Sequence, residues 1–219
     1  MDESADVTSR EDPASIGGRL RQTLVFALNF LKHPRMVGTF AVSSPALVRR
    51  LLQGVDWSRQ RRIVEFGPGV GTITGGILKA MAPEAGLLAI EMNTDFVREL
   101  ERRFPDPRLH IVNASAADVQ AQLARLGWPD ADLVISGIPF STMPAQVRDA
   151  ILDAVAAMLA PDGQFLVYQY ANHVLQPLRQ RFAVVEGESE WRNVVPVRIF
   201  RCRQPFAPAA ETERTTRPT

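Results

Sequence analysis

The sequence predicts an α/β protein in which a seven-stranded, mostly parallel sheet carries helices on both faces. Two observations support this prediction. Between residues 62 and 170, short apolar runs alternate with longer segments of helical periodicity, a pattern typical of parallel strands joined by helices. The chain has 219 residues, of which 46% are hydrophobic, and this is enough for one domain with a substantial core.

The predicted strands are the short apolar runs. They lie at residues 62–66, 87–91, 110–113, 132–136, 164–170, 182–186 and 194–203. Helices are expected between them at residues 72–81, 94–104, 116–126, 144–160 and 174–181. One more helix should begin at Pro45, because Ser44 is a typical N-cap residue and Gly54 is a typical residue at which a helix stops.

A further helix is expected near the start of the chain, and it is amphipathic. Between residues 19 and 33, leucine and phenylalanine recur at helical spacing, and Pro34 ends the pattern. The basic residues at its ends are Arg19, Arg21, Lys32 and Arg35. Such a helix either caps the sheet or lies in a membrane interface. Residues 1–15 and 207–219 are polar and aperiodic, so we expect disordered tails around a single domain at 16–206.

The composition excludes several kinds of site. The single cysteine, Cys202, rules out an internal disulfide and a cysteine cluster for a metal, and the three histidines lie far apart without ligand spacing. No metal site is therefore expected. The acidic N-terminus is unlike a signal peptide, and no apolar run approaches the roughly 20 residues of a membrane span. We expect a cytoplasmic protein that meets a membrane only at its surface.

The most informative motif is the stretch VEFGPGVGTIT at residues 64–74. It follows the first predicted strand, where an open α/β sheet places its ligand. A phosphate loop would need Lys-Ser or Lys-Thr after the glycines, and a dinucleotide fingerprint would need glycine in place of Thr72. The spacing Glu-x-Gly-x-Gly-x-Gly instead resembles the cofactor loop of class I S-adenosylmethionine methyltransferases. A dinucleotide site and a glycine turn without ligand are the alternatives.

That resemblance implies a set of cofactor contacts. The carboxylate of Glu65 would hold the ammonium group of the cofactor, and Glu91, at the end of the second strand, would accept both ribose hydroxyls. Ser115 stands where many of these enzymes have an acid that binds the adenine amino group. The expected cofactor contacts are Glu65, Gly67, Gly69, Gly71, Glu91, Met92, Ser115 and Ser136.

A second motif, SGIPF at residues 136–140, follows the fourth predicted strand. Methyltransferases that act on amino groups often carry a polar-x-Pro-aromatic segment here, and SGIPF resembles a longer variant of it. Backbone carbonyls and a short polar side chain would accept the N–H bonds of the amine, and Phe140 would offer a face for stacking or cation–π attraction. The alternative is an ordinary turn with Phe140 in the core. The resemblance places four residues near the transferred methyl, namely Ser136, Gly137, Pro139 and Phe140.

An amine must lose its proton before it attacks a methyl group, since an alkyl ammonium has a pKa of about 10.4. Tyr170, at the end of the fifth predicted strand, and His173, in the loop after it, are the titratable candidates for a catalytic role in this step. A packed tyrosine and a surface histidine are the alternatives. No metal is required, because positioning supplies much of the acceleration.

Four segments together resemble the bacterial phospholipid N-methyltransferases, whose core is similar to that of the rRNA adenine dimethyltransferases. The segments are VGTFAVSS at 37–44, VEFGPGVGTIT at 64–74, SGIPFSTMP at 136–144 and NVVPVRIF at 193–200. The resemblance implies a Rossmann-like fold, S-adenosylmethionine as cofactor, and methylation of phosphatidylethanolamine towards phosphatidylcholine. It also implies that the helix at 16–35 contacts the anionic inner face of the cell membrane. The membrane-contacting residues would be Arg19, Arg21, Lys32 and Arg35.

Three other functions remain open. An rRNA adenine methyltransferase would use the same loop, but an isoelectric point of about 8.0 is low for nucleic-acid binding, and the chain ends soon after the last predicted strand. A methyltransferase for a small soluble amine would need the same pocket. A membrane-binding protein that has lost catalysis is the third, and the intact acidic and glycine residues of the loop argue against it.

Overall fold

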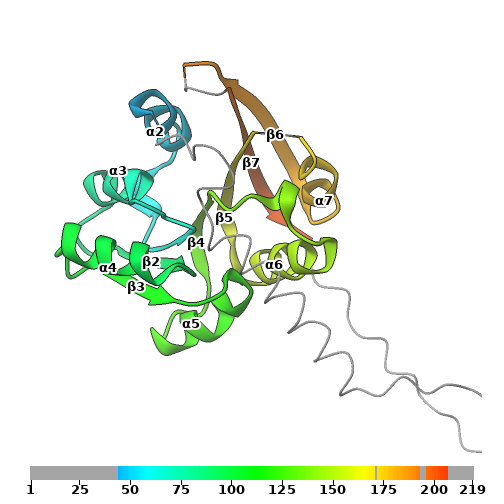
Figure 1. The fold of residues 1–219 in the computed structure, drawn as a ribbon. Coiled ribbons are helices and arrows are strands. Elements are labelled where there is room, and N and C mark those ends of the chain that lie inside the picture. The colour runs from blue at the N-terminus through cyan, green and yellow to red at the C-terminus, as the bar shows by residue number, and fades with distance from the viewer. Residues whose placement is uncertain (1–43, 171, 193–195, 207–219) are drawn as a thin grey trace, which may run out of the picture.

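The computed structural model describes residues 44–170, 172–192 and 196–206; the predicted N-terminal helix and both predicted tails lie outside these ranges. Within them, seven strands form one sheet with helices on both faces (Figure 1). The strand order is β3-β2-β1-β4-β5-β7-β6. Neighbours from β3 to β5 run parallel, whereas β7 runs antiparallel to both β5 and β6. The predicted α/β fold class is confirmed for this part of the chain.

The elements have the following bounds. The strands are β1 (Arg62–Phe66), β2 (Gly86–Glu91), β3 (Leu109–Asn113), β4 (Ala131–Ser136), β5 (Leu159–Gln169), β6 (Phe182–Glu190) and β7 (Val197–Pro205). The helices are α2 (Pro45–Leu52), α3 (Thr72–Ala80), α4 (Thr94–Arg103), α5 (Val119–Arg125), α6 (Ala145–Met158) and α7 (Leu175–Arg179). Single turns of 3₁₀ helix are η1 (Trp57–Arg59), η2 (Ala116–Asp118) and η3 (Phe140–Thr142).

Two strands extend well beyond their predicted bounds because of pairing. β5 begins at Leu159 rather than at residue 164, since Leu159 pairs with Ala131 ahead of a register shift in the β4–β5 ladder. β6 continues to Glu190 although its last residues have no apolar pattern, since they pair with β7 as far as Val197. Both extensions depend on a partner strand, so the local sequence gives no sign of them.

Each face of the sheet has its own hydrophobic cluster. On one face, α2 and α3 pack against alternate strand residues that include Ile63 and Leu87. On the other face, α5, α6 and α7 pack against the intervening residues, which include Val64 and Leu88. The central strands are thus buried on both sides, and this explains why their sequences are continuous apolar runs. The loops that follow these strands therefore rise from a rigid base.

Asp132 fastens β4 to β1 at the edge of the sheet where the parallel strands begin. Its carboxylate accepts the backbone N–H of Arg61 at 2.9 Å and of Arg62 at 2.8 Å, and it pairs with the Arg62 guanidinium at 2.8 Å. Burial raises the pKa of Asp132, but the hydrogen bonds from Arg62 and from the backbone outweigh burial and hold this pKa below its ordinary value. The carboxylate form is therefore the one that joins the two strands.

Asp132→Asn is expected to lower the free energy of unfolding at pH 7 by about 1.5–3 kcal/mol, because charge-assisted hydrogen bonds to Arg62 are weakened. Folding depresses the pKa of Asp132, so its contribution is present above the unfolded value of about 3.9 and is lost as pH falls through the folded value. The difference between the two proteins should therefore shrink at acidic pH. Urea unfolding followed by circular dichroism at pH 7 and pH 3 measures both effects.

Asp162→Asn is the matched control for that variant. Asp162 pairs with Arg59 at 3.4 Å, but the two side chains are 88% and 67% exposed, and exposed ion pairs contribute little. An equal loss of stability in both variants would contradict the role given to Asp132.

Candidate active site

The glycine loop follows β1 at the carboxyl end of the parallel strands, as the sequence predicts. Gly67, Gly69 and Gly71 have φ angles of +66°, +55° and +80°, a left-handed region that glycine adopts without strain. The loop then enters α3 at Thr72. Three left-handed residues within five keep the main chain close to the end of the sheet, where a ligand would lie.

The three glycines differ in what a side chain would meet. A Cβ atom on Gly67 would lie 2.8 Å from Ile138 Cγ2, and one on Gly71 would lie 2.5 Å from Phe104 Cε2. A Cβ atom on Gly69 would meet nothing within 4 Å. Gly67 and Gly71 are therefore needed for packing as well as for conformation, whereas Gly69 faces open space that a ligand can use.

The carboxylate of Glu91, at the end of β2, accepts two backbone N–H groups. Oε2 accepts from Gly69 at 3.1 Å and Oε1 accepts from Asn93 at 2.9 Å. Burial raises the pKa of Glu91, and these backbone hydrogen bonds oppose the rise. A carboxylate has about four acceptor positions, so two remain for hydroxyl groups such as those of a ribose. Glu91 thus shapes the loop and fits the predicted cofactor contact.

Glu65 is almost fully buried at the end of β1. Its side chain is 2% exposed, and its Oε2 accepts the hydroxyl of Thr74 at 2.7 Å. Burial raises the pKa of Glu65 from 4.5 to about 8, so the carboxyl holds a proton at pH 7. An ammonium group placed beside it would favour the charged form. Glu65 therefore fits the predicted role of holding the ammonium group. Binding of that cation would also release the proton from the Glu65 carboxyl group.

The ends of β2 and β3 are tied together beside Glu91. Asn113 Nδ2 donates to the Glu91 carbonyl at 2.9 Å, and this residue is absent from the predicted contacts. Ser115 Oγ accepts the N–H of Ala117 at 3.2 Å and so caps η2, which splits the predicted helix at 116–126 into η2 and α5. The hydroxyl of Ser115 still has its own proton and a second lone pair for a base. Met92, next to Glu91, is half-buried.

The SGIPF segment lies directly against the glycine loop. Gly137 N–H donates to the Phe66 carbonyl at 3.0 Å, which extends the β1–β4 contact beyond the strand ends. Ser136 is fully buried, and its hydroxyl has no hydrogen-bond partner within the described residues. A buried hydroxyl without a partner is costly, so this oxygen fits a ligand donor such as an amine N–H.

Two residues of β5 that the sequence reasoning missed support this segment. Gln169 Nε2 donates to the Ile138 carbonyl at 2.6 Å and is only 4% exposed. Tyr168 lies so close to Gly137 that a Cβ atom there would collide with its ring. The sequence feature that could have indicated them is the polar ending YQY of an otherwise apolar strand. Polar side chains at the end of a buried strand indicate contact with another element.

Phe140 requires a correction. We predicted an open aromatic face for the acceptor, but the ring is 1% exposed and belongs to the hydrophobic cluster under α6. The turn η3 begins at Phe140 and carries its side chain into the core rather than towards the ligand side. The core alternative is therefore the correct one, while Pro139 still forms the bend before η3.

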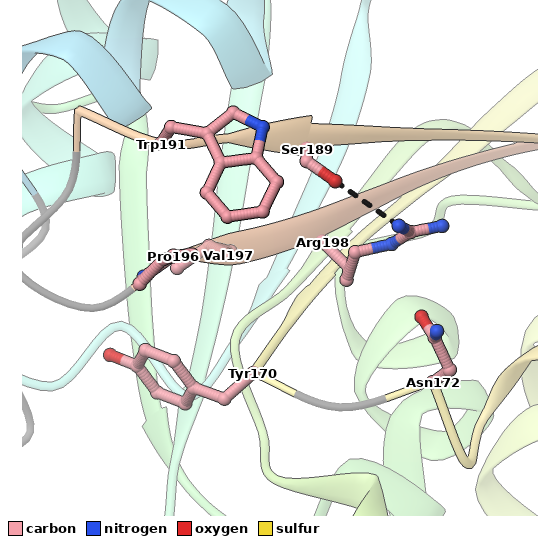
Figure 2. Close-up of a pocket in the computed structure, with 7 residues that line it drawn as sticks. All are labelled: Tyr170, Asn172, Ser189, Trp191, Pro196, Val197 and Arg198. Atoms are coloured by element: carbon pink, nitrogen blue, oxygen red, sulfur yellow. Dashed lines mark hydrogen bonds between the residues drawn. The ribbon is translucent and has the colours of Figure 1, made fainter.

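The structure places the two titratable candidates in different surroundings. Burial raises the pKa of Tyr170, which is the wrong direction for a group that must accept a proton near neutral pH. His173 is exposed on the loop before α7. Tyr170 lines a cavity of about 220 Å³ at the ends of β5 and β6 and the start of β7 (Figure 2). Tyr170 thus lies near the candidate site as a residue that lines this cavity.

Comparison with known proteins identifies the class. A family model described as the methyltransferase small domain matches residues 38–191, so the chain belongs to this family. Human methyltransferase-like protein 13 in complex with SAH has a TM-score of 0.55 at 20% identity, over 74% of this chain and 82% of that one. Precorrin-6y C5,15-methyltransferase from Geobacter metallireducens has a TM-score of 0.58 at 17% identity, over 72% and 87%. These two likenesses show the fold, and the chain is an S-adenosylmethionine-dependent methyltransferase.

Two curated relatives differ in how much of each chain they share. An ornithine lipid N-methyltransferase from Singulisphaera acidiphila is 30% identical over 186 residues, which covers 84% of this chain and 97% of that one. Ribosomal RNA small subunit methyltransferase A from Burkholderia cenocepacia is 34% identical over 86 residues, which covers 38% of this chain and 31% of that one. The chain therefore shares nearly the full length of the first relative and less than a third of the second.

Replacing the last two glycines of the loop one at a time separates the packing role from the space open to a ligand. Gly71→Ala should lower the free energy of unfolding by about 1–3 kcal/mol more than Gly69→Ala, because both variants carry the strain of a positive φ but only Gly71 would overlap Phe104. Gly69→Ala should instead weaken S-adenosylmethionine binding, since its Cβ atom projects into the open space. Denaturant unfolding and calorimetric titration measure the two effects. Equal stability of the two variants would contradict the packing role of Gly71.

The pH dependence of stability should depend on Glu65. Because folding raises its pKa, Glu65 stabilises the fold below its unfolded value of 4.5, and this contribution is lost as pH rises through about 8. Glu65→Gln should remove that loss, which amounts to at most about 1.4 kcal/mol per pH unit. Unfolding midpoints from pH 5 to pH 9 measure it. Glu101→Gln, an exposed change on α4, is the control, and its unfolding midpoints should follow those of the unmodified protein. If the midpoints of Glu65→Gln also follow the unmodified protein across this pH range, a protonated Glu65 is refuted.

Proposed function

We propose that the protein transfers methyl groups from S-adenosylmethionine to the amino group of a membrane lipid. The observation that carries this proposal is the match to an ornithine lipid N-methyltransferase along 97% of that relative. The match to the rRNA methyltransferase is confined to 31% of its length, so it favours an RNA acceptor less. The four sequence segments that resemble phospholipid N-methyltransferases support the same class of acceptor.

The candidate active site is suited to an amine. When bound, S-adenosylmethionine supplies an electrophilic methyl group. The buried hydroxyl of Ser136 has no partner within the described residues and so offers an acceptor for one N–H of the amine. The hydrogen bond from Gln169 to the Ile138 carbonyl fixes the segment around it. Apolar surroundings lower the pKa of an alkyl ammonium, so desolvation on binding favours the neutral amine. Fixing that amine in line with the methyl group supplies much of the rate.

The acceptor that we propose is phosphatidylethanolamine, methylated towards phosphatidylcholine, as the sequence resemblance implies. An ornithine lipid is the first alternative, because a relative acts on it by name. The two lipids share a primary amine, an anionic group a few bonds away and long acyl chains. An enzyme for either one needs an amine site next to an anion site at a membrane surface.

Methyl transfer from labelled S-adenosylmethionine tests this function. Vesicles of phosphatidylcholine would contain phosphatidylethanolamine, ornithine lipid or neither, and chromatography would separate the labelled products. We expect labelled mono-, di- or trimethylated phosphatidylethanolamine. Label in ornithine lipid alone would support a lipid amine as the acceptor but replace phosphatidylethanolamine by ornithine lipid. Label only in ribosomal RNA or in soluble amines, supplied in parallel, would overturn a lipid acceptor.

We further propose that the enzyme works at the inner face of the cell membrane, attached through residues 16–35. No helix in the described ranges is long and apolar enough to cross a membrane. Four basic residues near an anionic surface contribute about 1 kcal/mol each, and the leucine and phenylalanine stripe adds apolar burial. Electrostatic attraction and apolar burial of this size suit reversible attachment to the membrane.

Changing the four basic residues of this helix to glutamine should abolish co-sedimentation with anionic vesicles while cofactor affinity stays the same. The variant carries Arg19→Gln, Arg21→Gln, Lys32→Gln and Arg35→Gln. Its control removes the same charge from exposed arginines elsewhere, with Arg59→Gln, Arg98→Gln, Arg102→Gln and Arg125→Gln. If both variants lose vesicle binding to the same extent, net charge rather than the helix is responsible.

A further inference from the structure

The cavity at the ends of β5 and β6 and the start of β7 has an apolar side and a polar side (Figure 2). Trp191, Tyr170 and Pro196 gather on one side, and the Tyr170 hydroxyl points away from the polar side. Arg198, Ser189 and Asn172 lie on the other side. Trp191 and Tyr170 are 74% and 51% exposed, which is unusual for such large rings. The cavity therefore combines an exposed aromatic mouth with a basic, hydrogen-bonding interior.

Arg198 differs from the other arginines of β7. Arg201 pairs with Glu188 at 3.1 Å and Arg203 pairs with Glu186 at 3.0 Å, both across the ladder to β6. Arg198 faces Ser189 in that ladder instead, and Nη1 donates to Ser189 Oγ at 3.1 Å. Within the described residues, its Nε is buried without a hydrogen-bond partner, and no carboxylate pairs with it.

A guanidinium in this state is suited to an anion. Arginine presents its N–H groups in a planar fork that matches a carboxylate or phosphate, and a buried donor without a partner is costly. Ser189 holds one side of the fork, which fixes the direction of the remaining donors. The amide of Asn172 lies on the same side of the cavity and adds a donor for the same ligand.

The cavity adjoins the amine site. Arg198 is the register partner of Gln169 on β5, and Gln169 in turn donates to the Ile138 carbonyl of the SGIPF segment. Register partners in an antiparallel pair project to the same face of the sheet, and adjacent strands are about 4.8 Å apart. Arg198 thus stands about two strand spacings, roughly 10 Å, from β4, and its hydrogen bond to Ser189 holds the guanidinium on the β6 side of that gap. A head group with an amine and an anion a few bonds apart can span it.

We propose that this cavity binds the anionic group, a phosphodiester or a carboxylate, of the lipid whose amine is methylated. The inference rests on the proposed lipid acceptor and names the feature of the head group that is recognised. Arg198 holds the anion, Ser189 orients the guanidinium, and Trp191 and Tyr170 line the mouth through which the rest of the lipid leaves. The enzyme then selects amines by a charge at a fixed distance from the nitrogen.

Kinetics with matched acceptors test this inference. Phosphatidylethanolamine, ornithine lipid and octadecylamine would be presented in the same neutral micelles, so that two long-chain amines with an anionic group are compared with one that has none. Arg198→Gln should raise KM for the methylated anionic lipid by about ten- to a hundredfold, as expected for a charged hydrogen bond, and leave KM for octadecylamine unchanged. Arg198→Lys should restore part of the preference. Arg203→Gln, which removes an arginine from an exposed pair on the same strand, should leave it intact.

A binding experiment without turnover separates this inference from the proposed function. Tryptophan fluorescence, to which Trp191 contributes at the mouth of the cavity, would be titrated with glycerophosphoethanolamine and with Nα-acetylornithine. These two ligands distinguish a phosphodiester from a carboxylate. A response that disappears in Arg198→Gln, with cofactor affinity retained as a check on folding, supports the anion site even where no lipid is methylated. Lipid methylation whose KM is the same in the unmodified protein and in Arg198→Gln overturns the anion site while the proposed function stands.

Discussion

The hydrogen bond from Gly137 N–H to the Phe66 carbonyl joins the two loops on which the candidate active site is built. It continues the β1–β4 ladder past the strand ends, so the cofactor loop and the SGIPF segment are held together by the backbone itself. Gly67 makes this approach possible, because any side chain there would overlap Ile138. The methyl donor and the acceptor amine must meet within a few tenths of an ångström of their reactive geometry, and a backbone ladder is the most rigid way to fix that distance.

The same edge of the sheet holds two carboxyl groups that burial penalises. Burial is the largest influence on the pKa of both Glu65 and Glu91, and in both it raises the pKa. The two carboxyl groups differ in their surroundings. Backbone N–H groups that include those of Gly69 and Asn93 favour the charged form of Glu91, whereas Thr74 is the one residue whose hydrogen bonds favour the charged form of Glu65 within the described residues. A cationic ligand would relieve the penalty at Glu65. The fold therefore tolerates a buried carboxyl group that costs stability and that ligand binding would stabilise, as is common at functional sites.

Sequence reasoning succeeded where the structural cause is local and failed where it is not. The glycine loop and the acid at the end of β2 were predicted correctly in position, because spacing within a few residues determines both. Phe140 was misplaced because burial depends on how η3 turns against α6, which lies outside the motif. Gln169 and Arg198 were missed because their roles come from the antiparallel β5–β7 pairing, and no local pattern shows which strands become neighbours. The basic N-terminal helix stays a prediction.

The position of β7 explains how one small domain can recognise more than an amine. In the parallel part of the sheet, every strand sends its following loop to the ligand edge, and the loops after β1, β2 and β4 form the candidate active site. β7 runs the other way, so it brings the start of a strand, with Arg198, to that same edge. An antiparallel strand adds a rigidly held side chain without another loop. Because Arg198 projects from a strand paired on both sides, the distance between an anion bound there and the amine site is set by the sheet, and selectivity for head-group length follows from the fold.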